Sequence, residues 1–430
     1  MNNYTDYKQF TILGDGIESH SIKAFLIKHV PHAEIRIVPQ INESNYQEIM
    51  NSISDESLIL KSPGIPPRFV TKPYTTGTNI FFQEARARGW NIIAITGTKG
   101  KSTTASLTCA MLKAHQIDAV LAGNIGIAAV DLLDRPDYLG KALTVVLELS
   151  SYQLFDLAYS PDTACIINLY NDHADWHEGE ENYHNAKLNL VKRKETDIHS
   201  EKKLFFVYNA NFPKLQKASE QSHIIPCPID TDSFSHHEIP AHIIGEHNKL
   251  NVEAAFAVAS HYGVTKAEAL EALTTFKPLP HRLELVGTFH DIDFYDDAIS
   301  TTPESTIAGI EALTKMKSIS TIFLGGTDRG YDFTSLVTTL KKYHIENIVL
   351  FPPSGSRIFE LINEYTDADF VPHIFETTDM TAAVAFAFEN SKEGTACLLS
   401  TASPSYSLWK NFEEKGNEFK RAIQAYQREV

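Results

Sequence analysis

Residues 94–107, AITGTKGKSTTASL, have the composition of a phosphate-binding loop. An apolar run leads into Gly97, Thr98, Lys99, Gly100, Lys101, Ser102 and Thr103, and a helical pattern follows. Glycines let backbone N–H groups approach phosphate oxygens, while Lys101 can neutralise phosphate charge and Ser102 can bind Mg²⁺. Ile95 stands where the complete G-x-x-x-x-G-K-[ST] pattern has its first glycine, so an ordinary glycine-rich turn is the alternative. The strand before the loop and the helix after it favour phosphate binding.

A second candidate is Glu148, a lone carboxylate inside the apolar run VLELSSYQL. Burying an unpaired carboxylate costs free energy. Glu148 is therefore either paired with an Arg or Lys, or a ligand for Mg²⁺ beside the loop.

Polar residues also follow the predicted strand TACIIN, beginning with Asn171, Asp172 and His173. His173 and His177 have the i, i+4 spacing that could present two imidazoles for zinc, but the glutamate of H-E-x-x-H is missing. One histidine facing a divalent cation is favoured over a zinc protease. Lys187, in the helical segment YHNAKLNL, does not stand out by itself from a solvated lysine.

The last third of the chain has polar turns after its predicted strands. These turns contain Arg282 in HRLE, Asp296, Asp297 and Thr301 in YDDAISTTPEST, and Arg329 and Asp332 in GGTDRGYDF. Together they suggest a second ligand surface, because ligands bind at the carboxyl ends of parallel strands. Each turn taken alone is equally consistent with a solvated loop.

The elements that must position these residues follow an alternating pattern. Short Val- and Ile-rich runs alternate with helical patterns, which predicts an α/β fold with parallel sheets covered by helices. We expect three domains, at residues 1–88, 89–278 and 279–430. Residues 277–287, KPLPHRLELVG, are interpreted as a linker into the third.

Composition excludes several classes of protein. The net charge of −16, from 38 basic and 54 acidic residues, disfavours nucleic acid or an anionic membrane as the main partner. No apolar run approaches the roughly 18 residues of a membrane span, and the polar N-terminus MNNYTDYKQF has no signal-peptide pattern. The four cysteines are far apart and are interpreted as reduced core residues. We expect a cytoplasmic protein.

Motifs along nearly the whole chain resemble, in order, those of the Mur ligases of peptidoglycan synthesis. Within that family the resemblance is to the branch that adds glutamate to UDP-N-acetylmuramoyl-L-alanine. The motifs are GDG, SPGI, GTKGKST, GNIG, LELSSYQL, NDHADWH, YHNAK, GEHNKLN, HRLE, GGTDRGYDF and LLSTASPSYSLWKNFEEKGNEF. The last is the most specific.

The resemblance implies three domains: a Rossmann-like N-terminal domain for the uridine diphosphate, a central P-loop-type ATPase domain and a Rossmann-like C-terminal domain. It also implies a reaction. ATP would phosphorylate the carboxylate of the nucleotide-linked substrate, and the amine of D-glutamate would attack the acyl phosphate. The alternatives are the same reaction with L-glutamate, a ligase like folylpolyglutamate synthase, and a non-catalytic binding protein on the same scaffold. We expect a monomer.

Residue roles follow from the resemblance alone. Lys101 would hold ATP phosphates, Ser102 and Glu148 one Mg²⁺, and His173 with a carbamylated Lys187 a second Mg²⁺. Asn248, Asn251, Arg282 and Asp297 match positions that contact ATP. The expected substrate contacts are Gly16, Ser62, Gly64, Asn124 and Thr301, with Arg329, Ser405, Tyr406 and Phe412 in the glutamate pocket.

Three departures from the family pattern bear on these expectations. Lys99 replaces the usual Asn of G-T-N-G-K, which raises the positive charge at the phosphates. The segment VPQINE stands where an Asp-x-Arg usually meets uracil. Ile299 replaces a lysine that usually helps to bind glutamate, and this turn resembles a branch that adds L-glutamate.

Overall fold

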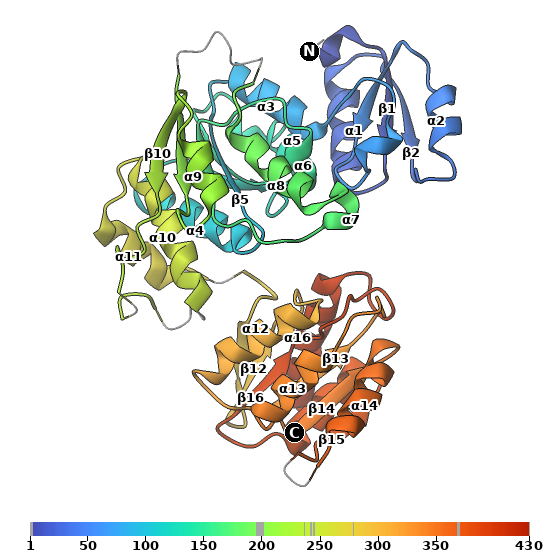
Figure 1. Ribbon diagram of the computed structural model, residues 1–430, viewed down its shortest axis with the longest axis vertical. Helices are drawn as coiled ribbons and strands as arrows, with labels where there is room; N and C mark the ends of the chain where they lie inside the picture. Colours follow the sequence, from blue (N-terminus) through green and yellow to red (C-terminus); the bar gives the residue numbers. More distant parts are fainter. Residues whose placement is uncertain are drawn as a thin grey trace. The chain divides into compact units, whose positions relative to one another are not determined.

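The computed structural model describes residues 3–194, 202–235, 237–240, 243, 246–277, 279–367 and 370–429. The chain forms two compact units (Figure 1). The first contains residues 1–240 and 247–276, and the second contains residues 241–246 and 277–430. Within the described residues, no helix is both long and apolar enough to cross a membrane.

The first unit begins with a four-stranded parallel sheet in the order β2-β1-β3-β4. Its strands are β1 (Gln9–Leu13), β2 (Glu34–Val38), β3 (Ser57–Lys61) and β4 (Tyr74–Thr75), and its helices are α1 (Ile17–His29), α2 (Tyr46–Ser52) and α3 (Gly77–Ala87). The loop between β1 and α1 carries Gly14 and Gly16, and the loop after β3 carries Ser62 and Gly64. Both loops therefore lie at the carboxyl edge of neighbouring strands.

A six-stranded parallel sheet in the order β10-β9-β8-β5-β7-β6 completes this unit. Its strands are β5 (Asn91–Thr96), β6 (Ala119–Gly123), β7 (Thr144–Glu148), β8 (Thr163–Ile166), β9 (Leu204–Tyr208) and β10 (Ile224–Pro228). Every residue of β7 and β8 is buried, as expected for strands covered by helices on both faces. The helices are α4 (Lys101–Ala114), α5 (Ala129–Leu132), α6 (Ser151–Phe155), α7 (Ala174–His177), α8 (Glu180–Leu188), α9 (Pro213–Ser219), α10 (Glu246–Ser260) and α11 (Lys266–Thr275).

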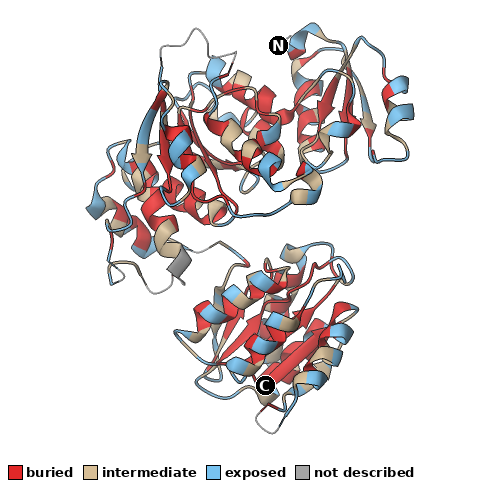
Figure 2. Cartoon of the chain, viewed as in Figure 1, coloured by how far each residue is buried: buried red, intermediate tan, exposed pale blue. Residues whose placement is uncertain are grey.

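One hydrophobic core runs through both sheets of the first unit. It extends from Tyr4 and Phe10, through Phe81 and Phe82 of α3, to Phe206 of β9. Figure 2 shows this concentration of buried residues along the strands. The boundary expected near residue 88 falls between α3 and β5, so the division into a first and a second domain stays a prediction.

The second unit is built on a six-stranded sheet in the order β11-β12-β16-β13-β14-β15. Its strands are β11 (Glu284–Phe289), β12 (Ile292–Asp296), β13 (Ile319–Gly325), β14 (Asn347–Phe351), β15 (His373–Glu376) and β16 (Ala396–Leu399). The helices are α12 (Pro303–Thr314), α13 (Thr334–Lys342), α14 (Ser354–Tyr365), α15 (Met380–Asn390) and α16 (Phe412–Glu429). Side chains alternate between two core clusters, with Ile322 and Leu324 in one and Phe323 in the other.

The interpretation of residues 277–287 as a linker is wrong in part, because Glu284–Phe289 forms β11. This strand is antiparallel to β12 and its register shifts between Leu285 and Gly287. It lies at the edge of the sheet and is only partly buried, so it lacks the continuous apolar run of the covered strands. The α/β fold is otherwise as predicted, and the described cysteines are unpaired, with three of the four buried.

Candidate active site

The predicted phosphate-binding loop lies between β5 and α4, at the carboxyl edge of the second sheet. Asn168, which follows β8, fixes its backbone from one side. The Oδ1 atom of Asn168 accepts the N–H groups of Thr98 at 2.8 Å and Lys99 at 3.0 Å, and its Nδ2 donates to the carbonyl of Lys99 at 2.9 Å. The side chain of Lys99 is exposed, while the Lys101 Nζ approaches the carbonyl of Thr98 at 3.4 Å.

Gly100 closes this loop in a conformation that only glycine adopts without strain. Its φ is +83°, and a Cβ atom there would lie 2.1 Å from the Oδ1 of Asn251. Asn251, on α10, is buried and donates to the Asn248 Oδ1 at 2.8 Å. The two asparagines expected at ATP therefore lie beside the phosphate loop.

Glu148 ends β7 and is fully buried beside the loop. The Ser102 Oγ donates to its Oε2 at 2.8 Å, and the Asn124 Nδ2 donates to its Oε1 at 3.3 Å. Both of these partners are uncharged. The pairing with an Arg or Lys that the sequence left open is therefore not observed among these contacts. A hydroxyl and a carboxylate in contact are the oxygen ligands that Mg²⁺ prefers.

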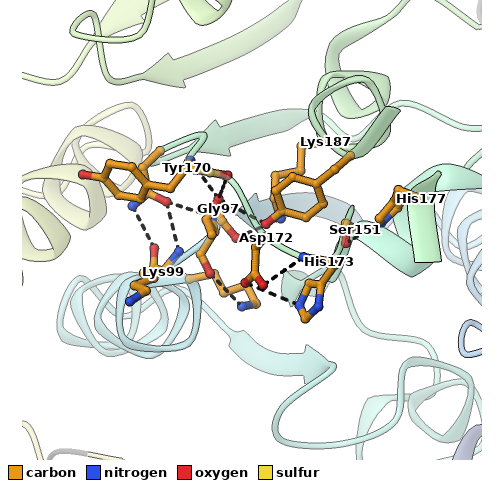
Figure 3. A network of polar contacts seen from close by, with 12 residues as sticks. Gly97, Lys99, Ser151, Tyr170, Asp172, His173, His177 and Lys187 are labelled. Carbon is orange, nitrogen blue, oxygen red and sulfur yellow. Dashed lines mark hydrogen bonds and ion pairs between the residues drawn. The ribbon is translucent and has the colours of Figure 1, made fainter. Parts of the chain in front are cut away.

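Lys187, on α8, reaches the same loop from another side (Figure 3). Its side chain is 2% exposed, and its Nζ donates to the carbonyl of Gly97 at 2.9 Å. The Nζ lies 4.7 Å from the centre of the Tyr183 ring, whose hydroxyl donates to the Thr98 Oγ1 at 3.1 Å. Burial, and secondarily the charge of Lys101, lowers the pKa of Lys187 to about 7. Lys187 is thus a buried amine with a large neutral fraction near pH 7.

His173 precedes α7 with a φ of +48°. Its backbone N–H donates to the Asp172 Oδ1 at 2.9 Å, and burial lowers the pKa of its imidazole. The Nε2 of His177 pairs with the Ser151 Oγ at 3.0 Å, and its ring stacks on Tyr152. Among the described residues, neither histidine belongs to a group of three potential metal ligands.

The two loops of the first sheet that carry the expected substrate contacts lie against each other. The Ser62 Oγ shares a hydrogen bond of 2.7 Å with the Ser19 Oγ, and the positive φ of Gly14 allows its backbone to approach Ser62. Gly16 caps the amino end of α1, and the carbonyl of Gly64 accepts the indole N–H of Trp176 at 3.0 Å. These residues lie at the carboxyl edge of the first sheet.

In the second unit the expected residues follow three neighbouring strands, β12, β16 and β13. Asp297 is buried and accepts the Ser400 hydroxyl at 2.8 Å and the N–H of Leu283 at 3.2 Å. Burial raises the pKa of Asp297 to about 6, although its hydrogen bonds and Arg282 oppose the shift. The Arg282 Nε and the Ser405 Oγ are buried without a partner in the described part of the chain.

The other expected residues of this unit are more open. Arg329 and Tyr406 are exposed, and Thr301 and Phe412 are half-buried. The carboxyl edge of this sheet thus brings together the expected ATP and glutamate residues of the second unit.

Sequence reasoning missed several residues that hold the site. Asn168 ends the segment TACIIN, and its position directly after a predicted strand was the sequence signal that could have placed it at the site. His281 pairs with Asp296 at 2.6 Å, and the Lys420 Nζ lies 3.4 Å from the same carboxylate. Lys415 is fully buried, and burial lowers the pKa of its amine to about 7. A single lysine in a charged helical segment gives no sequence signal of such burial.

Comparisons with known proteins agree with this arrangement. Two family models match: "Mur ligase middle domain" at residues 95–226 and "Mur ligase, glutamate ligase domain" at residues 281–403. The UDP-N-acetylmuramoylalanine–D-glutamate ligase of Halalkalibacterium halodurans is 30% identical over 87% of this chain and 85% of its own. The UDP-N-acetylmuramoyl-L-alanine–L-glutamate ligase of a Micromonospora species is 31% identical over 85% of this chain and 82% of its own.

Solved structures share the fold at lower identity. The UDP-N-acetylmuramate-alanine ligase MurC of Thermotoga maritima has a TM-score of 0.63 at 15% identity, over 98% of this chain and 100% of its own. The MurF ligase of Thermotoga maritima, solved in complex with ADP, has a TM-score of 0.61 at 15% identity, over 99% of this chain and 100% of its own. Sequence identity of 30% over most of both chains, with matching family models, shows that this protein belongs to the Mur ligase family.

Proposed function

We propose that the protein is an ATP-dependent ligase that adds D-glutamate to UDP-N-acetylmuramoyl-L-alanine in the synthesis of a peptidoglycan precursor. One observation carries the proposal: the buried Ser102–Glu148 pair and the buried amine of Lys187 meet at one phosphate loop. The relatives named for this reaction cover most of the chain. We further propose that it acts as a monomer in the cytoplasm.

The chemistry requires activation of a carboxylate. A carboxylate oxygen is a poor leaving group until it is phosphorylated, after which the amine of glutamate can displace phosphate. Lys101 and the loop would hold the ATP phosphates, and Asn124 would lie near the carboxylate that accepts the phosphoryl group. Bound Mg²⁺ would neutralise the charge that develops on the phosphoryl oxygens.

The residues at the loop fit Mg²⁺ in two different ways. Ser102 and Glu148 offer oxygen ligands as they stand. Lys187 would repel a cation as an ammonium group, but its neutral amine can react with CO₂ to give a carbamate and release a proton. The lowered pKa of Lys187 supports this modification, and the carbamate together with His173 would hold a second Mg²⁺.

The second unit would supply the remaining contacts. In the second unit we propose Arg282 and Asp297 as ATP contacts, and in the first unit Asn248 and Asn251. The glutamate pocket would consist of Thr301, Arg329, Ser405, Tyr406 and Phe412.

L-glutamate is the second candidate, because Ile299 leaves no cation at its position and one relative is named for L-glutamate. The test measures phosphate release from ATP with UDP-N-acetylmuramoyl-L-alanine and either enantiomer, with Glu148→Gln as the inactive control. We expect release with D-glutamate. Release with L-glutamate alone would reverse the assignment, and release with neither would overturn the proposed function.

A further inference from the structure

Lys61, the last residue of β3, is a charged side chain buried inside the first unit. Its Nζ pairs with the Asp156 Oδ2 at 2.8 Å, and neither side chain is more than 7% exposed. Burial lowers the pKa of Lys61, although the charge of Asp156 opposes the shift. A buried ion pair is often no more stabilising than apolar side chains of similar volume. The contacts of Lys61 therefore need an explanation other than stability.

Asp156, the residue that follows α6, is a fixed anchor for this pair. Its Oδ1 accepts the hydroxyl of Tyr74 from β4 at 2.6 Å, and its carbonyl accepts the Asn79 Nδ2 from α3 at 2.9 Å. The Asn79 Oδ1 in turn accepts the N–H of Ala158 at 2.9 Å. Helix α6 follows β7 of the second sheet, whereas β3 and β4 belong to the first sheet. The contacts of Asp156 therefore join the two sheets of the first unit.

The same ammonium group holds the loop that follows β3, which has the sequence SPGI. The Lys61 Nζ donates to the carbonyl of Ile65 at 2.9 Å and approaches the carbonyl of Ser62 at 3.4 Å. Trp176, on α7, donates its indole N–H to the carbonyl of Gly64 at 3.0 Å. The Lys61 Nζ lies 5.5 Å from the centre of the Trp176 ring, within the range of a cation–π contact. Lys61 and Trp176 thus hold three carbonyls of the SPGI loop.

The SPGI loop contacts both of the regions that the proposed reaction uses. It contains Ser62 and Gly64, which are expected to contact the nucleotide-linked substrate. Trp176 lies on α7, which begins directly after His173, the proposed metal ligand. The ring of Tyr152 on α6 packs against the rings of Trp176 at 4.7 Å and His173 at 5.2 Å. A displacement of the SPGI loop would therefore change the position of the nucleotide relative to α7.

We propose that Lys61 is a positioning residue that fixes the SPGI loop against α6 and α7, so that the nucleotide-linked substrate is aligned with the phosphate loop. This inference rests on the proposed function. Because its side chain is fully buried, Lys61 acts through the loop carbonyls and not by contact with the substrate. A misplacement of about 1 Å in such a supporting contact can cost about a hundredfold in rate.

The test compares Lys61→Met with the double variant Lys61→Met/Asp156→Asn. Calorimetry measures the Kd for UDP-N-acetylmuramoyl-L-alanine and, separately, for ATP, and thermal unfolding is followed in parallel. Lys61→Met should unfold at a lower temperature, because a buried carboxylate loses its cation. The double variant should regain part of that loss, because its neutral amide can still accept the Tyr74 hydroxyl. Both variants should bind the nucleotide about tenfold more weakly, since neither has a donor for the loop carbonyls, while the Kd for ATP stays unchanged.

Lys72→Met is the matched control. The Lys72 Nζ also pairs with an aspartate, Asp55, at 2.7 Å and donates to the carbonyl of Ile53 at 2.6 Å, but it is partly exposed and does not contact the SPGI loop. This variant should bind both ligands as the unmodified protein does.

The outcomes separate the Lys61 proposal from the proposed function. If the double variant regains affinity for the nucleotide together with its stability, or if ATP binding weakens equally, Lys61 is merely structural and the proposal is wrong. It is also wrong if Lys61→Met binds the nucleotide as tightly as the unmodified protein. In these cases the proposed function stands. If the unmodified protein does not bind this nucleotide, the proposed function fails and the Lys61 proposal fails with it.

Discussion

The burial of Lys187 predicts that its amine is carbamylated in the absence of substrate. With a pKa of about 7, about three quarters of the amine is neutral at pH 7.5. A lysine of ordinary pKa would be neutral in about one molecule per thousand at that pH. Since only the neutral amine reacts with CO₂, Lys187 should be modified far more readily than any solvated lysine.

The assay is ¹³C NMR of the protein incubated with ¹³C-bicarbonate, with phosphate release measured in parallel. We expect a carbamate signal from Lys187 that weakens as the pH falls from 8 to 6, because the amine becomes protonated. Lys187→Arg should lose the signal, and Lys187→Ala should be inactive but partly rescued by short carboxylic acids. Lys192→Ala, at an exposed position of the same segment, should keep the signal. A carbamate spectrum that is the same in Lys187→Arg as in the unmodified protein, or full activity of Lys187→Ala, would refute the reasoning.

Two further predictions concern backbone strain and a buried charge. Gly100→Ala should raise the KM for ATP by tenfold or more, because its Cβ would displace Asn251, whereas Gly140→Ala, with a φ of +73° and open space, should leave that KM unchanged. If the two substitutions raised the KM equally, backbone strain rather than the contact with Asn251 would explain the effect. Burial lowers the pKa of Lys415 to about 7, so its amine binds fewer protons in the folded state than in the unfolded state. Its contribution to the free energy of unfolding therefore rises with pH. Between pH 7 and pH 9, urea unfolding should show the unmodified protein gaining about 2 kcal/mol relative to Lys415→Met, and a constant difference would mean that the pKa is not lowered.

The fold was predictable where strands are covered on both faces. The runs NIIAIT, LTVVLEL and TACLLS became β5, β7 and β16, because continuous apolar runs of this length have few other places to be buried. Strands that the pattern did not reveal are short or lie at sheet edges. The two-residue β4 and the partly exposed β11 contain too few buried positions to produce a periodicity.

The site could be predicted where the type of a side chain by itself indicates its chemistry. Ser102 and Glu148 were expected at one Mg²⁺ and are in contact. Lys187 was indistinct in the sequence because its burial depends on α8 packing across the loop after β5, about ninety positions earlier in the chain. The burial of Lys415 on α16 and the placement of Asn168 likewise depend on contacts with residues outside their own elements, which local pattern cannot reveal.

The incomplete phosphate motif has a structural cause that connects these observations. Ile95, in place of the first glycine, is an interior residue of β5 and pairs with Glu148 of β7 and Cys165 of β8. The strand therefore continues through that position, and the loop begins only at Gly97. Side chains from other elements hold the backbone of this shorter loop in place. Asn168 holds Thr98 and Lys99 from the end of β8, and Lys187 holds the carbonyl of Gly97 from α8. Lys187, which we propose as a metal ligand, thus also fixes the loop that we propose binds ATP. Modification of Lys187 would therefore change both the charge and the conformation of that loop.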